Sequence, residues 1–227
     1  MKYIIGNWKS HKTSPEIQTW AQGWKQLKVP SSDQVWVVVC APLIGLPVLH
    51  ELLPKLSLGA QVLSPFGDGA YTGAVSARMV KEYASFALLG HVERRKYFGE
   101  TDQQVAQQVL QAIDNEIVPI VAVSDANWAQ QLSQFDNQQL LKILVMYEPP
   151  SAISTSGSGS HAADLQSVKT AITQIKAEFK VKGVLYGGSV DPENVATYIK
   201  EDVIDGVVPG AASLDPSTFA ALVEASL

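Results

Sequence analysis

The chain alternates short apolar runs with longer segments of helical periodicity along its 227 residues. A strand–helix–strand order predicts a parallel sheet, because parallel neighbours need a crossover connection that a helix supplies. The apolar runs that we interpret as strands are Tyr3–Gly6, Val35–Cys40, Leu58–Gln61, Phe86–Gly90, Val118–Val123, Ile143–Tyr147, Gly183–Tyr186 and Ile204–Val208. Eight such strands with intervening helices predict an α/β protein, a (β/α)8 barrel that forms one domain over residues 1–227.

Helical signals lie in the connections. A set of apolar residues between the sixth and seventh strands recurs at helical spacing: Val168, Ala171, Ile172, Ile175 and Phe179. Asp215 followed by Pro216 predicts the start of the last helix, with a capping residue and then proline in the first turn. Between Val123 and Ile143 we expect only about one short helix, around Ala126–Phe135.

Composition narrows the class of protein. A content of 46% hydrophobic and 17% charged residues suits a soluble chain with a large core. A net charge of −5 without a basic cluster argues against a nucleic-acid partner. Cys40 is the single cysteine, so an intrachain disulfide or thiolate metal site is excluded, and we expect it to be buried and inert. No apolar run has the length of a membrane helix, and a strand begins at Tyr3 with no room for a signal peptide, which predicts a cytoplasmic protein.

Three chemically versatile side chains follow predicted strands, at the end where barrels of this kind build their active sites. Lys9 follows the first strand, His91 follows Gly90 at the end of the fourth, and Glu148 closes the sixth. Taken singly, each has an ordinary explanation: a surface lysine, a structural histidine, or a capping or ion-paired glutamate. A histidine beside a helix N-terminus favours the neutral imidazole, and a carboxylate near apolar side chains is suited to act as a base.

Five motifs, in this order along the chain, resemble those of the triosephosphate isomerase family: Gly6-Asn7-Trp8-Lys9, Gly90-His91-Val92-Glu93-Arg94-Arg95, Tyr147-Glu148-Pro149, Tyr186-Gly187-Gly188-Ser189-Val190 and Gly210-Ala211-Ala212-Ser213-Leu214. The resemblance covers essentially the whole chain. It implies a TIM barrel that interconverts dihydroxyacetone phosphate and D-glyceraldehyde 3-phosphate through an enediolate, in glycolysis and gluconeogenesis. It also implies that no metal or organic cofactor takes part.

The resemblance assigns a role to each catalytic candidate. Glu148 would be the base, and His91 the electrophile that shuttles protons between the enediolate oxygens. Lys9 would stabilise negative charge electrostatically, with Asn7 donating at the same place and Glu93 pairing with Lys9.

The phosphate group would be held by backbone N–H groups after the seventh and eighth strands, a recurring feature of such barrels. Gly187-Gly188 alone is typical of a plain turn, but a second glycine motif after the next strand favours a phosphate site. The residues that the resemblance assigns to substrate and phosphate are Ser154, Gly187, Gly188, Ser189, Gly210 and Ala211.

The segment after the sixth strand matches the family's mobile lid, with the residues Pro149, Pro150, Ser151, Ala152, Ile153, Ser154, Thr155 and Ser156. Most relatives have tryptophan at the position of Ser151 and glycine at those of Ser154 and Ser156. The dipeptide Ser124-Asp125 also replaces a usual Gly-Glu. These departures remove no catalytic group.

The segment Val62–Gly73 matches the family's loop that inserts into a neighbouring subunit, and Phe66, Tyr71 and Thr72 are its interface candidates. An aromatic residue at an exposed loop tip favours an oligomer. We predict a homodimer. A homotetramer is the alternative, because archaeal relatives with a similarly short segment between Val123 and Ile143 are tetrameric.

Two other functions stay open at this point. The first is another phosphate-binding barrel isomerase, which would have paired aspartates after strands one and five, whereas the first strand here leads to Asn7 and Lys9. The second is a barrel that binds a sugar phosphate without turnover, which the altered lid suggests.

Overall fold

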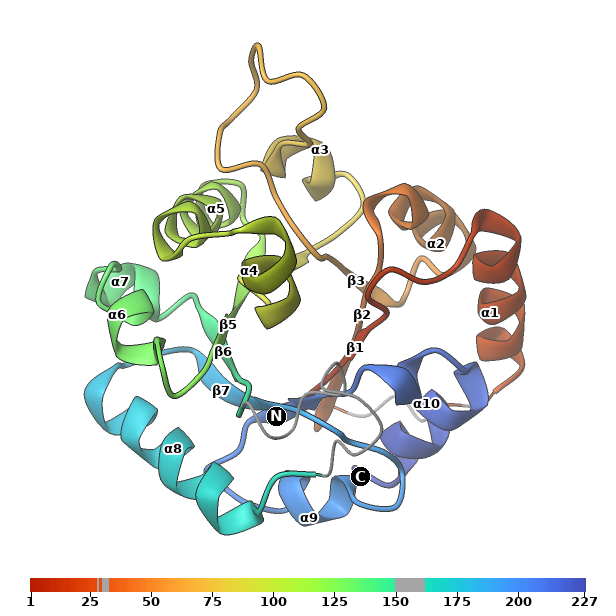
Figure 1. Cartoon of the computed structure of the whole chain (residues 1–227). Coiled ribbons are helices and arrows are strands. Elements are labelled where there is room, and N and C mark those ends of the chain that lie inside the picture. The colour runs from red at the N-terminus through yellow and green to blue at the C-terminus, as the bar shows by residue number, and fades with distance from the viewer. Residues whose placement is uncertain (28, 30–32, 150–161) are drawn as a thin grey trace.

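The computed structural model describes residues 1–27, 29, 33–149 and 162–227, and these form a closed barrel of parallel strands surrounded by helices (Figure 1). Each strand pairs with its successor, and β1 closes the barrel against β8. The strands are β1 (Lys2–Asn7), β2 (Val35–Cys40), β3 (Ser57–Ala60), β4 (Phe86–Leu89), β5 (Val118–Val123), β6 (Leu144–Tyr147), β7 (Gly183–Gly187) and β8 (Gly206–Val208). The predicted (β/α)8 barrel is confirmed.

Helices occupy the connections between strands and cover the outside of the barrel. They are α1 (Ser14–Gln26), α2 (Leu46–Leu52), α3 (Ala77–Lys81), α4 (Val92–Phe98), α5 (Asp102–Asp114), α6 (Trp128–Leu132), α7 (Asn137–Leu140), α8 (Leu165–Glu178), α9 (Val195–Ile199) and α10 (Pro216–Glu224), with 3-10 turns η1 (Leu43–Gly45) and η4 (Ala211–Ser213). As predicted, Asp215 caps the last helix, accepting a hydrogen bond from the Thr218 backbone.

The prediction for the connection between β5 and β6 was wrong. Two short helices, α6 and α7, lie between β5 and β6 where we expected one. The reason is local: Asp136 accepts hydrogen bonds from the backbone N–H groups of Gln138 and Gln139, and so begins a new helix.

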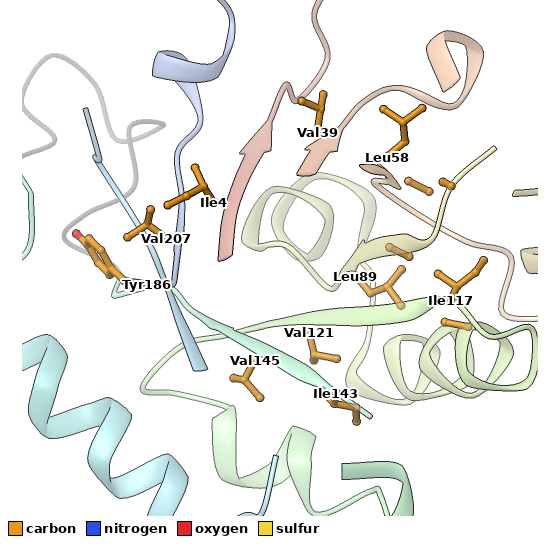
Figure 2. Packing of buried hydrophobic residues seen from close by; sticks show 14 of the residues in the cluster. Ile4, Val39, Leu58, Leu89, Ile117, Val121, Ile143, Val145, Tyr186 and Val207 are labelled. Atoms are coloured by element: carbon orange, nitrogen blue, oxygen red, sulfur yellow. The ribbon is translucent and has the colours of Figure 1, made fainter. Parts of the chain in front are cut away.

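Strand residues alternate between two buried layers, as the pleat requires. Ile4 belongs to the layer between barrel and helices, and Ile5 to the cluster inside the barrel. Figure 2 shows part of the outer layer, in which Val39 and Leu89 lie on different strands. Cys40 is fully buried inside the barrel, as predicted, and burial raises the pKa of its thiol to about 12. With both faces packed, the barrel leaves chemistry to the strand ends.

The connection from β3 to α3 projects away from the rest of the molecule, at the top of Figure 1. Asp68 anchors it by accepting a 2.6 Å hydrogen bond from the Ser76 hydroxyl and pairing with Arg78. Within this connection, Phe66 stacks on Tyr71 with ring centroids 4.5 Å apart, although each is 45% exposed. The loop therefore holds a defined shape while it presents apolar rings to its surroundings.

Within the part of the chain that is described, no helix is both long and apolar enough to cross a bilayer.

Candidate active site

Lys9 lies just beyond the carboxyl end of β1 in an unusual backbone conformation. Its φ of 53° is in the left-handed region, where a non-glycine residue costs of order 1–3 kcal/mol. The Lys9 Nζ forms a 2.7 Å ion pair with Glu93 of α4, and the Lys9 N–H donates to the Asn7 side-chain oxygen at 3.0 Å. Strained backbone that holds a charged group in one place is typical of a functional site.

Asn7, the last residue of β1, is oriented from two sides. Its Oδ1 accepts the Lys9 N–H and also the Nε2–H of Gln61, at 3.2 Å. Gln61 also donates to the Cys40 carbonyl at 3.0 Å, so its own position is set by β2. These two bonds fix the orientation of the amide, so its Nδ2 group is the donor that this side chain offers to a ligand.

We did not predict a role for Gln61. It follows the apolar strand β3 as the first polar residue, which is the same signal that pointed to Lys9 and Glu148.

His91 is buried and caps α4, where its Nδ1 accepts a 3.2 Å hydrogen bond from the Glu93 backbone N–H. An imidazole nitrogen that accepts this bond carries no proton, so the neutral ring bears its proton on Nε2. The Nε2 atom lies 3.1 Å from the Glu148 Oε1. The ring is therefore oriented with a donor toward the carboxylate.

Glu148 follows β6 and is buried against the start of α4. Its Oε2 accepts a 3.3 Å hydrogen bond from the Val92 backbone N–H, while Oε1 faces His91. The preceding residue, Tyr147, donates a 2.7 Å hydrogen bond to Asp125 after β5. Burial, together with this bond, raises the pKa of the Tyr147 phenol, which keeps it a donor.

Gly187 at the end of β7, Gly188 just after it and Gly210 after β8 lie where the backbone approaches the catalytic candidates. A Cβ at Gly187 would lie 3.1 Å from the Glu148 Cγ, and one at Gly188 would overlap the Tyr186 hydroxyl. A Cβ at Gly210 would lie 3.5 Å from the Lys9 Cε. Both predicted phosphate segments thus border the same end of the barrel as the charged groups.

Two adjoining cavities open at this end. One of about 420 Å³ is lined by Asn7, Lys9, Gln61, His91 and Glu93 among others. The second, of about 470 Å³, shares Lys9 and extends to Gly210 and Ala211. A small anionic substrate could reach from the charged groups to the glycine segment after β8.

The remaining predicted residues are those of the lid and Ser189. Of the predicted lid, only Pro149 is described, and Pro150–Ser156, including Ser154, lie outside the described residues. Ser189 follows β7 beside Gly188, and its carbonyl accepts a hydrogen bond from Asn194. Within the described ranges, no cluster of three or more histidine, cysteine, aspartate or glutamate side chains could hold a metal ion.

A closed parallel barrel with a lysine, a histidine and a glutamate at the carboxyl ends of its strands defines a barrel enzyme with a site for a small anionic substrate. The family model for triosephosphate isomerase matches residues 2–226. The chain belongs to this family and has its activity, that of an intramolecular aldose–ketose isomerase.

Relatives along the full length agree with this assignment. A triosephosphate isomerase of Symbiobacterium thermophilum is 34% identical, covering 98% of this chain and 96% of the relative. Those of Dictyoglomus turgidum and Gloeobacter violaceus are each 32% identical, over 96% and 98% of this chain and 96% and 97% of the relatives.

Proposed function

We propose that Glu148 is the base that converts dihydroxyacetone phosphate into the enediolate. It removes a proton from the hydroxyl-bearing carbon next to the carbonyl, and returns it to the former carbonyl carbon to give glyceraldehyde 3-phosphate. Its present partners, the Val92 N–H and His91, hold the carboxylate at the site before substrate arrives. When substrate binds between these groups, the carboxylate exchanges these contacts for the substrate carbon.

His91 supplies the proton that the enediolate oxygens exchange. The Glu93 N–H bond to Nδ1 supports a neutral ring with Nε2–H as donor, which polarises the carbonyl without carrying a charge. Lys9 then provides the positive charge opposite the developing oxyanion. Because its Nζ is already positioned by Glu93, little reorganisation is needed in the transition state.

The phosphate is bound by backbone N–H groups of Gly187, Gly188 and Ser189 at and just beyond the end of β7, and of Gly210 and Ala211 after β8. The support is their position: both segments border the catalytic groups, and Gly210 lines the same cavity as Lys9. Lys9 thus contacts both the phosphate end and the reacting end of the substrate. The reaction belongs to glycolysis and gluconeogenesis, which places the enzyme in the cytoplasm.

The working unit is a homodimer in which each copy receives the other's Val62–Gly73 loop. The stacked Phe66 and Tyr71 give that loop exposed aromatic rings, and Thr72 follows Tyr71 in the chain. A cavity of about 290 Å³, formed between the base of this copy's own loop and the residues Arg94 and Phe98, could receive the partner's loop. Light scattering at micromolar concentration is expected to give twice the chain mass. Four times the mass would instead establish the tetramer, and an active monomer would exclude the proposed loop exchange.

One observation carries this mechanism. Lys9, His91 and Glu148, which follow strands β1, β4 and β6, lie together at the carboxyl end of the barrel. A coupled assay with glyceraldehyde 3-phosphate, which follows dihydroxyacetone phosphate as it forms, tests it directly. Turnover that disappears in Lys9→Met and falls in Glu148→Gln supports these roles. Binding of phosphoglycolate, an enediolate mimic, without any turnover would instead favour a sugar-phosphate binding protein.

A further inference from the structure

Arg95 lies on α4, one turn beyond His91, and its guanidinium joins three separate segments. Its Nε donates to the Gly90 carbonyl at 2.7 Å, and its Nη2 donates to the Gln131 side chain on α6, also at 2.7 Å. Its Nη1 pairs with the Asp102 carboxylate at the start of α5. A guanidinium holds several N–H donors in a fixed planar arrangement. Arginine therefore suits a site with three separate acceptors better than lysine does.

The bond to Gly90 acts directly on the backbone that leads to His91. The Gly90 carbonyl and the His91 nitrogen belong to one rigid peptide plane, so holding the oxygen sets the direction in which His91 leaves β4. Gly90 has a φ of 70°, and a Cβ there would lie 2.9 Å from the Arg95 guanidinium. The turn and the arginine therefore fit each other closely.

Gln131 completes the binding site for the guanidinium. It is fully buried, and while its Oε1 accepts from Arg95, its Nε2 donates to the Asp102 carbonyl at 3.1 Å. Both ends of the amide are thus used, in surroundings where an unpaired polar group would be costly. These two bonds fix Gln131 between Arg95 and Asp102.

The network continues from Asp102 to the residues that follow β5. Asn127 donates to the Asp102 carboxylate at 3.4 Å and accepts the Ser124 N–H at 2.8 Å. The next residue after Ser124 is Asp125, the acceptor for Tyr147, which precedes Glu148. One end of the network lies before His91, and the other lies before Glu148.

We infer that Arg95 is a positioning residue for the isomerisation, which sets the placement of His91 relative to Glu148 and is itself held by Gln131. The inference rests on the proposed roles of His91 and Glu148. It predicts an effect on the chemical step and not on phosphate binding, because the phosphate segments follow β7 and β8, away from this network.

Arg95→Lys is the first test, because it keeps the charge and removes the fork. A shorter, tetrahedral ammonium cannot satisfy Gly90, Asp102 and Gln131 together. We expect kcat to fall on the order of tenfold to hundredfold, the cost of misplacing a catalytic group by up to an ångström. KM for glyceraldehyde 3-phosphate and inhibition by inorganic phosphate are expected to stay within about twofold, since ground-state binding is untouched.

A second variant and a control keep the test informative. Gln131→Met leaves the Arg95 side chain intact and removes its buried partner, together with the bond from Gln131 to the Asp102 carbonyl, so a smaller fall in kcat is expected. Lys96→Met removes a positive charge from the exposed side of the same helix and is expected to leave kcat unchanged.

The readout that separates positioning from mere stability is the imidazole ¹⁵N signal of His91, assigned by its loss in His91→Gln. Arg95→Lys should shift this signal in folded protein. An unchanged signal, an unchanged kcat with a lower melting temperature, or a rise in KM that accounts for the lost activity would overturn the inference. If the wild-type protein shows no turnover, the proposed mechanism fails, whereas the His91 signal still decides whether Arg95 positions that ring.

Discussion

The two ends of the barrel place their charged side chains in different surroundings. At the amino end, the Lys2 ammonium donates to the Glu201 carbonyl at 2.8 Å and to the Ile204 carbonyl, next to β8. Lys176 of α8 pairs at 2.7 Å with Asp205, which also accepts the Val184 N–H. The charged side chains at this end bind backbone carbonyl and N–H groups or a charge on a neighbouring element. These contacts fix helices and loops to the strands.

At the carboxyl end, the charged groups pair mainly with one another, and they come from different strands. Lys9 after β1 meets Glu93 after β4, and His91 after β4 meets Glu148 after β6. These pairs lie beside or just behind a cavity. The comparison teaches that one end stabilises the fold, while the other holds groups ready to exchange partners with a substrate.

Cavity size alone would mislead here. A cavity of about 580 Å³ at the amino end, bordered by Trp24, Trp36 and Leu53, exceeds the 420 Å³ cavity beside Lys9 and His91. Both linings are mostly apolar, and titratable side chains border each of them, but only the smaller cavity brings together Lys9, His91 and Glu93 from different strand ends. Chemistry, and not volume, locates the site.

The largest expected effect comes from a matched pair of lysine substitutions at the two ends. Lys9→Met should lower kcat/KM by about 10³-fold or more, because a positioned charge at the oxyanion is lost. It should also weaken phosphoglycolate more than His91→Gln does. Lys2→Met makes the same chemical change at the amino end and should leave turnover intact. Equal losses in both variants would erase the functional distinction between the ends.

Next is the base. Glu148→Gln keeps the size of the side chain and most of its hydrogen bonding, but it cannot accept the substrate proton. We expect kcat to fall by about 10² to 10⁴-fold with little change in substrate affinity. Glu178→Gln on the exposed side of α8 is the matched control. Near-normal turnover in Glu148→Gln would rule out this carboxylate as the base.

The amino end should respond in stability instead. In Lys2→Met, two backbone carbonyls lose a charged donor, so the free energy of unfolding should fall by about 1–2 kcal/mol. Urea unfolding of wild type and variant, with kcat measured on the same preparations, checks both parts. A variant that is as stable as wild type would show that these hydrogen bonds merely replace hydration.

The smallest expected effect is on the stability of the fold, and it concerns Asp215, a charged residue at the carboxyl end of the barrel. Hydrogen bonds from the Thr218 backbone and hydroxyl lower the pKa of Asp215 below its ordinary value. A lowered folded-state pKa stabilises the fold above the ordinary aspartate pKa, about 3.9, and this stabilisation is lost as the pH falls through the folded value. Asp215→Asn retains the accepting oxygen without the charge.

Melting temperatures of wild type and Asp215→Asn should therefore differ near neutral pH and converge on acidification. A difference that does not change with pH would assign the stabilisation to hydrogen-bond geometry alone.

Much of this molecule follows from local sequence. Apolar runs predicted the strands, because strands buried on both faces need continuous apolar residues, and the errors at their ends are one or two residues. The Asp215-Pro216 start of α10 was readable because a cap is a local hydrogen bond. The same reasoning missed the second helix at Asp136, since a long connection of ambiguous periodicity hides where one helix stops.

The amino-acid sequence by itself determined the barrel class and which side chains stand at the strand ends. Tertiary structure alone decided how they combine: the 3.1 Å contact of His91 with Glu148, the orientation of Asn7 by Gln61, and the guanidinium site of Arg95. These contacts join residues on different strands and helices. Barrel closure and register bring such residues together, and no local pattern encodes a distance that depends on every intervening element.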